Sequence, residues 1–308
     1  MNAEILNDKA LETLNNGDYN WHDAQPLFRK NVEKNPSVMT FNNLGVFYLE
    51  FGMMLANGKV QNADKLGLRY LKKAASTAKS YTNLMALGDY YLQPQLLDFA
   101  DYYNAEKYYK QAADINETTD VMINLGGIYF MQKRYAEASA VYEQVSLSPD
   151  YQDDQNMHRL SYAFSLVYNN QPLNSQKINA IVKFLGLTDD PDVFALAYLN
   201  EDMNLAERFI NNIFNVFLYH IPIIAMAVDC LLKLDKYIEA ENLINLQIKA
   251  FEENEFPDKQ DIIILSQISD NPIVRKKQIS NYEYIPKFAR PCYFIGCKKH
   301  NCLSPTTT

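Results

Sequence analysis

Residues 119–149 read TDVMINLGGIYFMQKRYAEASAVYEQVSLSP, and this stretch decides the fold class. Apolar and small residues recur in it at spacings of three and four, which place them on one face of an α-helix. In the first half these residues are Met122, Leu125, Gly126 and Tyr129. In the second half they are Tyr135, Ala138, Tyr142 and Val145. The pattern predicts two amphipathic helices joined by a short polar turn at residues 132–134.

Two small residues indicate how closely these helices pack. Gly126 and Ala138 lie on the apolar faces of the two predicted helices. A leucine at either position would overpack the crossing and cost about 1–3 kcal/mol or more. We therefore expect the helices to cross in close contact at these residues.

A Leu-Gly pair followed by a tyrosine occurs twice more, at Leu44-Gly45…Tyr48 and at Leu87-Gly88…Tyr91. Each segment ends in a second amphipathic stretch with small residues, marked by Gly67, Leu71 and Ala74 or by Ala105, Tyr109 and Ala112. Both units carry insertions relative to residues 119–149, the later one around residues 93–102. Such self-similarity predicts stacked repeats, which usually bind other macromolecules rather than catalyse reactions.

The pattern Leu125-Gly126-x2-Tyr129…Ala138-x3-Tyr142…Pro149 resembles the tetratricopeptide repeat, a helix–turn–helix unit of about 34 residues. The endings Lys72-Lys73-Ala74-Ala75 and Lys110-Gln111-Ala112-Ala113 are similar to the longer SEL-one-like variant. The resemblance is clearest over residues 20–150 and 222–251. It implies an all-α fold, a right-handed α-solenoid of about six or seven stacked antiparallel helix pairs over residues 1–271. An irregular tail is expected at residues 272–308.

Beyond residue 150 the repeat pattern decays. Residues 158–168 and 176–185 form one diverged pair, and residues 192–199 and 205–214 form a short one. Residues 223–234 with 237–251 fit the pattern better, and residues 261–268 are expected to cap the array. Whether residues 151–190 kink the solenoid between two subdomains stays open.

The resemblance implies that the first helix of each pair lines a concave, peptide-binding face. By register, the candidate binding residues are Asn42, Val46, Met85, Asp89, Asp120, Ile123 and Gly127, with Leu49, Leu92 and Phe130 beside them. Chaperone-binding members of the family use Lys, Arg and Asn there to hold a terminal carboxylate. These positions carry no Lys or Arg, which favours a basic or apolar peptide as the partner. The alternative is that the residues only pack against the next repeat.

Charge is unevenly distributed along the chain. From Pro272 to the end there are seven basic residues and one acid, a net charge of +6, which leaves −14 on the rest of a chain whose total is −8. An acidic body argues against wrapping on nucleic acid. A basic tail is able to dock on such a body, and we expect Arg275-Lys276-Lys277 to form a solvated helix face.

The apolar segments of the sequence bear on where the protein is located. No apolar signal-peptide core follows the first residues, and the most apolar stretch, at 213–234, is interrupted by Asn215, His220, Pro222 and Asp229. We expect a buried helix pair there, no membrane span, a cytoplasmic protein and cysteines that are reduced.

The tail contains Cys292-x4-Cys297-x2-His300-x-Cys302, the residue types of a Cys3His structural zinc site at unusually tight spacing. The alternatives are packed or free thiols, or a redox pair. Basic residues alternate there with aromatic ones (Tyr282, Tyr284, Phe288, Tyr293 and Phe294), a pattern that also suits stacking on nucleobases.

The sequence contains none of the common catalytic motifs for phosphate binding, dinucleotide binding, metalloproteolysis or serine hydrolysis. We therefore expect no enzyme. The leading hypothesis is a scaffold or adaptor that binds a protein segment or peptide. The alternatives are a peptide-sensing regulator, although no DNA-binding helix-turn-helix precedes the repeats, and a zinc-dependent nucleic-acid or protein binder that acts through the tail.

Overall fold

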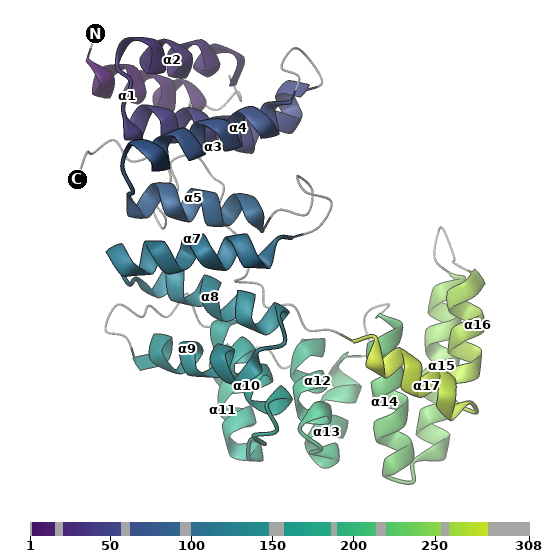
Figure 1. Ribbon diagram of the computed structural model, residues 1–308. Coiled ribbons are helices and arrows are strands. Elements are labelled where there is room, and N and C mark those ends of the chain that lie inside the picture. The colour runs from purple at the N-terminus through teal and green to yellow at the C-terminus, as the bar shows by residue number, and fades with distance from the viewer. Residues whose placement is uncertain are drawn as a thin grey trace. The chain divides into compact units, whose positions relative to one another are not determined.

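A computed structural model describes residues 2–15, 21–56, 62–92, 100–147, 157–185, 190–213, 220–253 and 259–282. These residues form sixteen α-helices and no β-strand, which confirms the predicted all-α solenoid class. Successive helices pack as eight pairs (Figure 1). The first four pairs are α1 (Ala3–Asn15) with α2 (Trp21–Lys34), α3 (Val38–Ala56) with α4 (Ala63–Thr77), α5 (Tyr81–Tyr91) with α7 (Tyr102–Ile115), and α8 (Thr119–Met131) with α9 (Tyr135–Leu147). The last four are α10 (Met157–Tyr168) with α11 (Ser175–Leu185), α12 (Pro191–Leu199) with α13 (Met203–Ile213), α14 (Ile221–Lys233) with α15 (Tyr237–Glu252), and α16 (Lys259–Ile268) with α17 (Pro272–Ser280).

The described helices belong to two compact units. Helices α1 to α9 form unit 1, and helices α10 to α17 form unit 2. The boundary lies within residues 151–190, where the sequence left a kink open. The segment predicted to be irregular from residue 272 begins instead with helix α17, capped by the Asn271 side chain and started by Pro272.

The glycine of each Leu-Gly pair lies where the two helices of a pair cross. A Cβ atom added at Gly126 would come within 2.8 Å of the Tyr142 ring, and one at Gly88 would come equally close to the Tyr109 ring. Both tyrosines are fully buried. Because no side-chain carbon fits in this space, the ring of the second helix packs directly on the backbone of the first. This contact explains the Leu-Gly pairs physically.

Replacing Gly126 with leucine is therefore expected to destabilise unit 1 by about 1–3 kcal/mol or more, because the new side chain must displace the Tyr142 ring. The exposed Gln144, on the second helix of the same pair, provides a control for the added apolar surface. Gln144→Leu should change the urea-unfolding midpoint little. Equal losses in the two variants would contradict the close crossing.

The turn inside a helix pair has the same backbone geometry in four consecutive pairs. Lys133, Asn170, Glu201 and Asp235 each adopt a left-handed conformation with φ between 56° and 61°. Beside each of them an N–H donates to a carbonyl five residues earlier, as in Arg134 to Tyr129 at 2.8 Å. This arrangement is a Schellman-type helix end. It shows that the helix pairs of unit 2 repeat the geometry of α8 and α9 although their side-chain pattern has decayed.

The last residue of this turn also ties neighbouring pairs together. Arg134 pairs with Glu106 of α7 at 2.7 Å, and Lys236 pairs in the same way with Glu207 of α13. These contacts are partly exposed, so each adds little stability by itself. Both contacts join the turn of one pair to the second helix of the pair before it.

Within the part of the chain that the structure describes, no helix combines the length and the apolar character that crossing a bilayer requires.

Candidate functional site

The seven predicted peptide-binding residues all lie on first helices of unit 1, namely α3, α5 and α8. We call their common side the first-helix face of unit 1. The structure places six of them in buried positions: Asn42, Val46, Met85, Asp89, Ile123 and Gly127. Only Asp120 is partly exposed, and the neighbouring Leu49, Leu92 and Phe130 are buried as well.

These first helices are enclosed on every side over most of their length. Residues 40–49, 83–90 and 123–130 are buried without interruption. The second helices differ, since α7 buries only Ala105, Tyr109 and Ala112. A helix that is covered on one side exposes a residue every three or four positions, as α7 does. The first helices α3, α5 and α8 therefore have polypeptide against both their sides.

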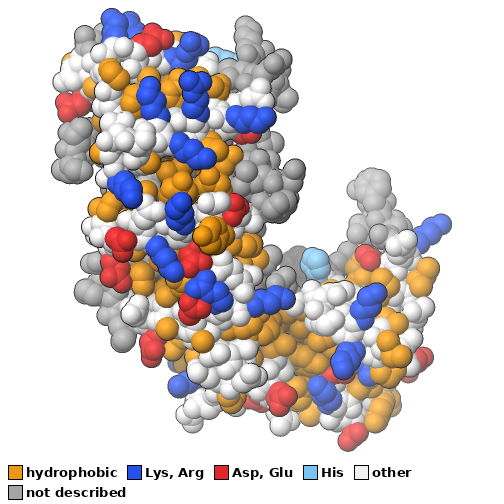
Figure 2. Space-filling view, in the orientation of Figure 1, with side chains coloured by type: hydrophobic (Ala, Val, Ile, Leu, Met, Phe, Trp, Pro, Cys, Tyr) orange, Lys and Arg blue, Asp and Glu red, His pale blue; other side chains and the backbone are white. Residues whose placement is uncertain are grey.

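Charged residues are unevenly distributed among the helices of unit 1. Helices α3, α5 and α8 contain three acids, Glu50, Asp89 and Asp120, and neither Lys nor Arg. Helices α2, α4 and α7 carry the basic side chains Arg29, Lys30, Lys34, Lys65, Arg69, Lys72, Lys73, Lys107 and Lys110. Figure 2 shows Lys and Arg side chains running down one face of unit 1. Helices α3, α5 and α8 are therefore net negative, as is the second helix α9 with Glu137 and Glu143, whereas α2 and α4 are net positive and α7 is neutral, since Glu106 and Asp114 balance its two lysines.

Asp89 is the buried acid of the first-helix face. Its side chain is only 2 % exposed, and the Tyr109 hydroxyl donates a hydrogen bond to its Oδ1. A buried carboxylate is costly unless it is bonded, and its field is weakly screened. Asp89 is thus held in place by the second helix and favours a cationic group beside it.

Buried amides that the sequence analysis missed hold the same helices together. The Asn43 side chain donates to Oδ1 of Asn7 at 2.6 Å, and the Asn83 side chain donates to the Leu71 carbonyl at 3.1 Å. Asn43 comes directly before the pair Leu44-Gly45, and Asn124 comes directly before the pair Leu125-Gly126. This repeated Asn-Leu-Gly pattern was the signal in the sequence that could have predicted a buried amide.

Unit 2 contains a polar cluster around Asp229 of α14. The carboxylate accepts hydrogen bonds from the Tyr198 hydroxyl at 2.7 Å, from Lys233 at 2.9 Å and from Nε of Arg275 at 3.1 Å. Arg275 is 12 % exposed, so the expectation of a solvated face was wrong for this residue and holds for the exposed Lys276 and Lys277. The sequence did not show that a carboxylate on a distant helix meets Arg275. We call this group the Asp229 cluster.

Burial and hydrogen bonds shift the pKa values of the residues in and beside the Asp229 cluster. Burial works to raise the pKa of Asp229, but the hydrogen bonds from Tyr198, Lys233 and Arg275 outweigh it and hold that pKa below its usual value. Burial and the bond to Asp229 raise the pKa of Tyr198 far above its usual range, so this hydroxyl stays a donor. Burial also raises the pKa of the neighbouring Cys230 thiol to about 12, which makes it a poor nucleophile.

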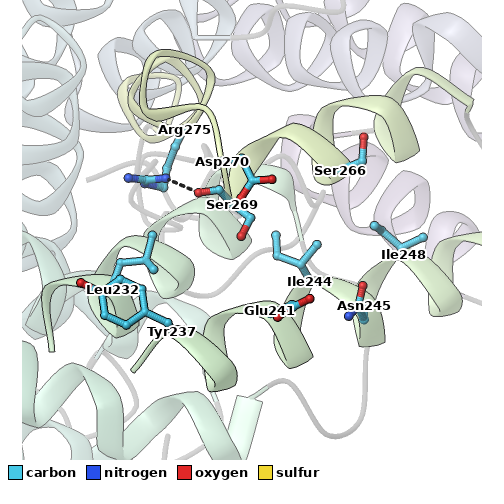
Figure 3. A pocket seen from close by; sticks show the side chains of 10 residues that line it. All are labelled: Leu232, Tyr237, Glu241, Ile244, Asn245, Ile248, Ser266, Ser269, Asp270 and Arg275. Atoms are coloured by element: carbon cyan, nitrogen blue, oxygen red, sulfur yellow. Dashed lines mark hydrogen bonds between the residues drawn. The ribbon is translucent and has the colours of Figure 1, made fainter. Parts of the chain in front are cut away.

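A cavity of about 640 Å3 opens between α15, α16 and α17 (Figure 3). Its lining consists of Leu232, Tyr237, Glu241, Ile244, Asn245, Ile248, Ser266, Ser269, Asp270 and Arg275. Arg275 donates hydrogen bonds to Asp229 and to the Ser269 carbonyl. Ser266 donates to the Ile263 carbonyl. Among these lining residues there is no His or Cys. Its acidic residues are Glu241 and Asp270.

The predicted zinc ligands Cys292, Cys297, His300 and Cys302 lie outside the described residues, so the metal site stays a prediction. Among the described residues, no three His, Cys, Asp or Glu side chains group in a way that would hold a metal ion.

No model of a known protein family matches the chain, and no curated protein matches it. The helical repeat is therefore established by the consecutive packed pairs and their shared turn geometry.

Proposed function

We propose that this protein is a non-catalytic scaffold or adaptor of the tetratricopeptide class, and that the first-helix face of unit 1 binds a basic, partly apolar peptide segment. The observation that carries the proposal is the absence of Lys and Arg from three first helices of unit 1. Helices α3, α5 and α8 present acids and apolar residues without any Lys or Arg.

The residues of this face match such a ligand chemically. Carboxylates at Asp89 and Asp120 attract Lys or Arg, and the Asn42 amide bonds a peptide backbone or side chain. Val46, Met85, Ile123 and Gly127 are buried, so the partly exposed acids Glu50 and Asp120 are the residues of these helices that a ligand meets first. A carboxylate-bearing ligand would meet repulsion here. Because the helices are preformed, little ordering entropy opposes association.

The proposal is tested with the full chain and a short labelled peptide of Lys, Phe and Ala, compared with the same peptide in which Glu replaces Lys. Fluorescence anisotropy should detect binding of the basic peptide, weakening with salt, and little binding of the acidic one. Glu50→Lys/Asp120→Lys alters partly exposed acids on the first helices. This variant should weaken binding of the basic peptide by about tenfold or more.

The matched control is Glu33→Lys/Glu143→Lys, which makes the same charge change at exposed positions on second helices. It should bind nearly as the unaltered protein does. Equal losses in both variants would show general charge attraction and reject a defined face. Equal binding of acidic and basic peptides would reject the proposed ligand class.

A further inference from the structure

We propose that the cavity between α15, α16 and α17 binds a primary ammonium group carried on an aliphatic chain. Two sources share this chemistry, namely the lysine side chain of a protein segment and a free aliphatic polyamine. The site lies wholly within unit 2, so it is separate from the first-helix face of unit 1. The inference goes beyond the proposed function and does not depend on it.

The path of α17 leaves room for this cavity. Helix α16 packs on α15 and so continues the stacking of the helices, but α17 packs more extensively on α14 than on α16. The ion pair of Arg275 with Asp229, at 3.1 Å, joins α17 to α14. The cavity lies between α15 on one side and α16 with the start of α17 on the other (Figure 3). Its volume of about 640 Å3 falls within the range of about 300–1,000 Å3 that is usual for small-molecule sites.

The basic residue of the lining does not favour an anionic ligand. Nε of Arg275 donates to Asp229, and its Nη1 donates to the carbonyls of Ile268 at 2.9 Å and Ser269 at 3.1 Å. The side chain is only 12 % exposed. The other charged residues of the lining are Glu241 and Asp270. Because these two carboxylates accompany one guanidinium that is already bonded to a third carboxylate, the lining favours a cation.

Glu241 and Asp270 are available to bind such a cation. Within the described part of the chain, neither carboxylate forms an ion pair or a hydrogen bond. Both residues are exposed. Figure 3 shows Glu241 on α15 and Asp270 in the turn between α16 and α17, with Ile244 between them. A ligand that enters there gains hydrogen bonds without breaking any that these carboxylates make in the described chain.

Part of the lining is aliphatic. Ile244 is buried, and Leu232 and Ile248 are partly buried. Methylene groups of a ligand that pack on these side chains leave water, which is favourable. Tyr237, one helical turn before Glu241, adds an aromatic face that attracts a cation. The cavity therefore combines apolar surface for a chain with carboxylates for its charged end.

A primary ammonium group suits this lining better than a guanidinium. Its three N–H donors diverge, so one group is able to donate to carboxylates on two sides of the cavity. A guanidinium is planar and presents its donors as a fork to a single carboxylate. The stem of a lysine or the methylene groups of a polyamine pack on Ile244 and Ile248.

The proposal is tested with the full chain by isothermal titration calorimetry at low ionic strength, where exposed carboxylates are little screened. The first probe is spermidine, a linear triamine. The second is a short acetylated and amidated alanine peptide with a single lysine, and the same peptide with norleucine in place of lysine is the neutral reference. At least one amine probe should bind with a dissociation constant below about 5 mM, and the norleucine peptide should not bind.

A matched pair of variants locates the binding. Glu241→Gln/Asp270→Asn keeps the shape of both side chains and removes their charge, so it should weaken amine binding by about tenfold or more. Glu239→Gln/Glu252→Gln makes the same charge change at exposed acids of α15 that do not line the cavity. This control should bind as the unaltered protein does. Neither variant removes an ion pair or a side-chain hydrogen bond of the described chain, so both should keep the urea-unfolding midpoint.

The two probes distinguish the sources of the amine. Cavity-dependent binding of spermidine alone would identify a polyamine site, and cavity-dependent binding of the lysine peptide alone would identify a site for a protein segment. No saturable binding of either probe below about 5 mM would overturn the proposal. An affinity that Glu241→Gln/Asp270→Asn leaves unchanged would also overturn it. Equal losses in the control variant would do the same, because they indicate general attraction to an acidic surface.

Variants of unit 1 separate this site from the first-helix face. Glu50→Lys/Asp120→Lys should leave spermidine binding unchanged. If the lysine peptide lost affinity only in that variant, it would bind unit 1, which would reject the cavity as a lysine site and leave the proposed function standing. If it lost affinity only in Glu241→Gln/Asp270→Asn, the cavity would be its site, whatever the first-helix face binds.

Discussion

Replacing Tyr109 with alanine is expected to lower the free energy of unfolding of unit 1 by about 3–5 kcal/mol. The side chain is fully buried, and its ring packs on the backbone of Gly88 where α5 and α7 cross. Truncation leaves a cavity that the surrounding helices fill only in part. It also removes the hydroxyl that donates to the buried carboxylate of Asp89. The loss of the ring and the loss of the hydroxyl both weaken the contact between α5 and α7.

Equilibrium urea unfolding measures the total effect, and native-state hydrogen exchange locates it. Because a repeat array is stabilised mainly by neighbouring pairs, protection should fall in α5 and α7 and then in α4 and α8. Helices of unit 2 should keep their protection. An equal loss of protection in both units would contradict the division of the chain into two compact units.

Two variants separate the causes. Tyr103, on the same helix, is 77 % exposed, and Tyr103→Ala should change the free energy of unfolding by no more than about 0.5 kcal/mol. Tyr109→Phe keeps the ring and removes only the hydroxyl, so it should cost about 1–3 kcal/mol. If Tyr109→Phe cost as much as Tyr109→Ala, the hydrogen bond would account for the whole effect and the packing argument would be wrong.

The helix pairs of unit 1 were predictable because their contacts are local in sequence. Gly126 meets Tyr142 only sixteen residues later, and both lie at repeat-specific positions. The spacing of these residues therefore predicted that the two helices pack together. In unit 2 the same turns are built with Asn170, Glu201 and Asp235 in left-handed conformations. Since glycine is absent at these turns, residue types did not indicate their shared geometry.

Helix α17 shows where prediction from sequence stopped. The Asn271-Pro272 pair is a helix-start signal that sequence reasoning could have used. The position of the helix depends on Arg275 reaching Asp229, 46 residues earlier in the chain. No spacing rule identifies such a pair. The candidate face is similar, because the sequence identified Asp89 by register but gave no sign of its burial or of the Tyr109 hydroxyl bonded to it.

Asp229→Ala is expected to lower the free energy of unfolding of unit 2 by about 2–4 kcal/mol. The substitution removes the acceptor for Tyr198, Lys233 and Arg275 together, and it leaves the Tyr198 hydroxyl and the Arg275 guanidinium in a poorly hydrated site. The range allows for the 18 % exposure of the Asp229 side chain, which weakens each interaction. Glu252→Ala, at an exposed position of α15, provides the control and should be nearly neutral.

The pH dependence of stability tests whether the charge of Asp229 holds α17 against α14. The pKa of Asp229 is lower in the folded protein than in the unfolded chain, so the carboxylate stabilises the fold above the unfolded pKa of about 4. That contribution declines as the pH falls through the folded pKa. The gap in stability between the unaltered protein and Asp229→Asn should therefore be constant from about pH 5 to pH 7 and shrink below about pH 4. A gap that stayed constant down to pH 3 would show that packing, rather than the charge of Asp229, holds α17 against α14.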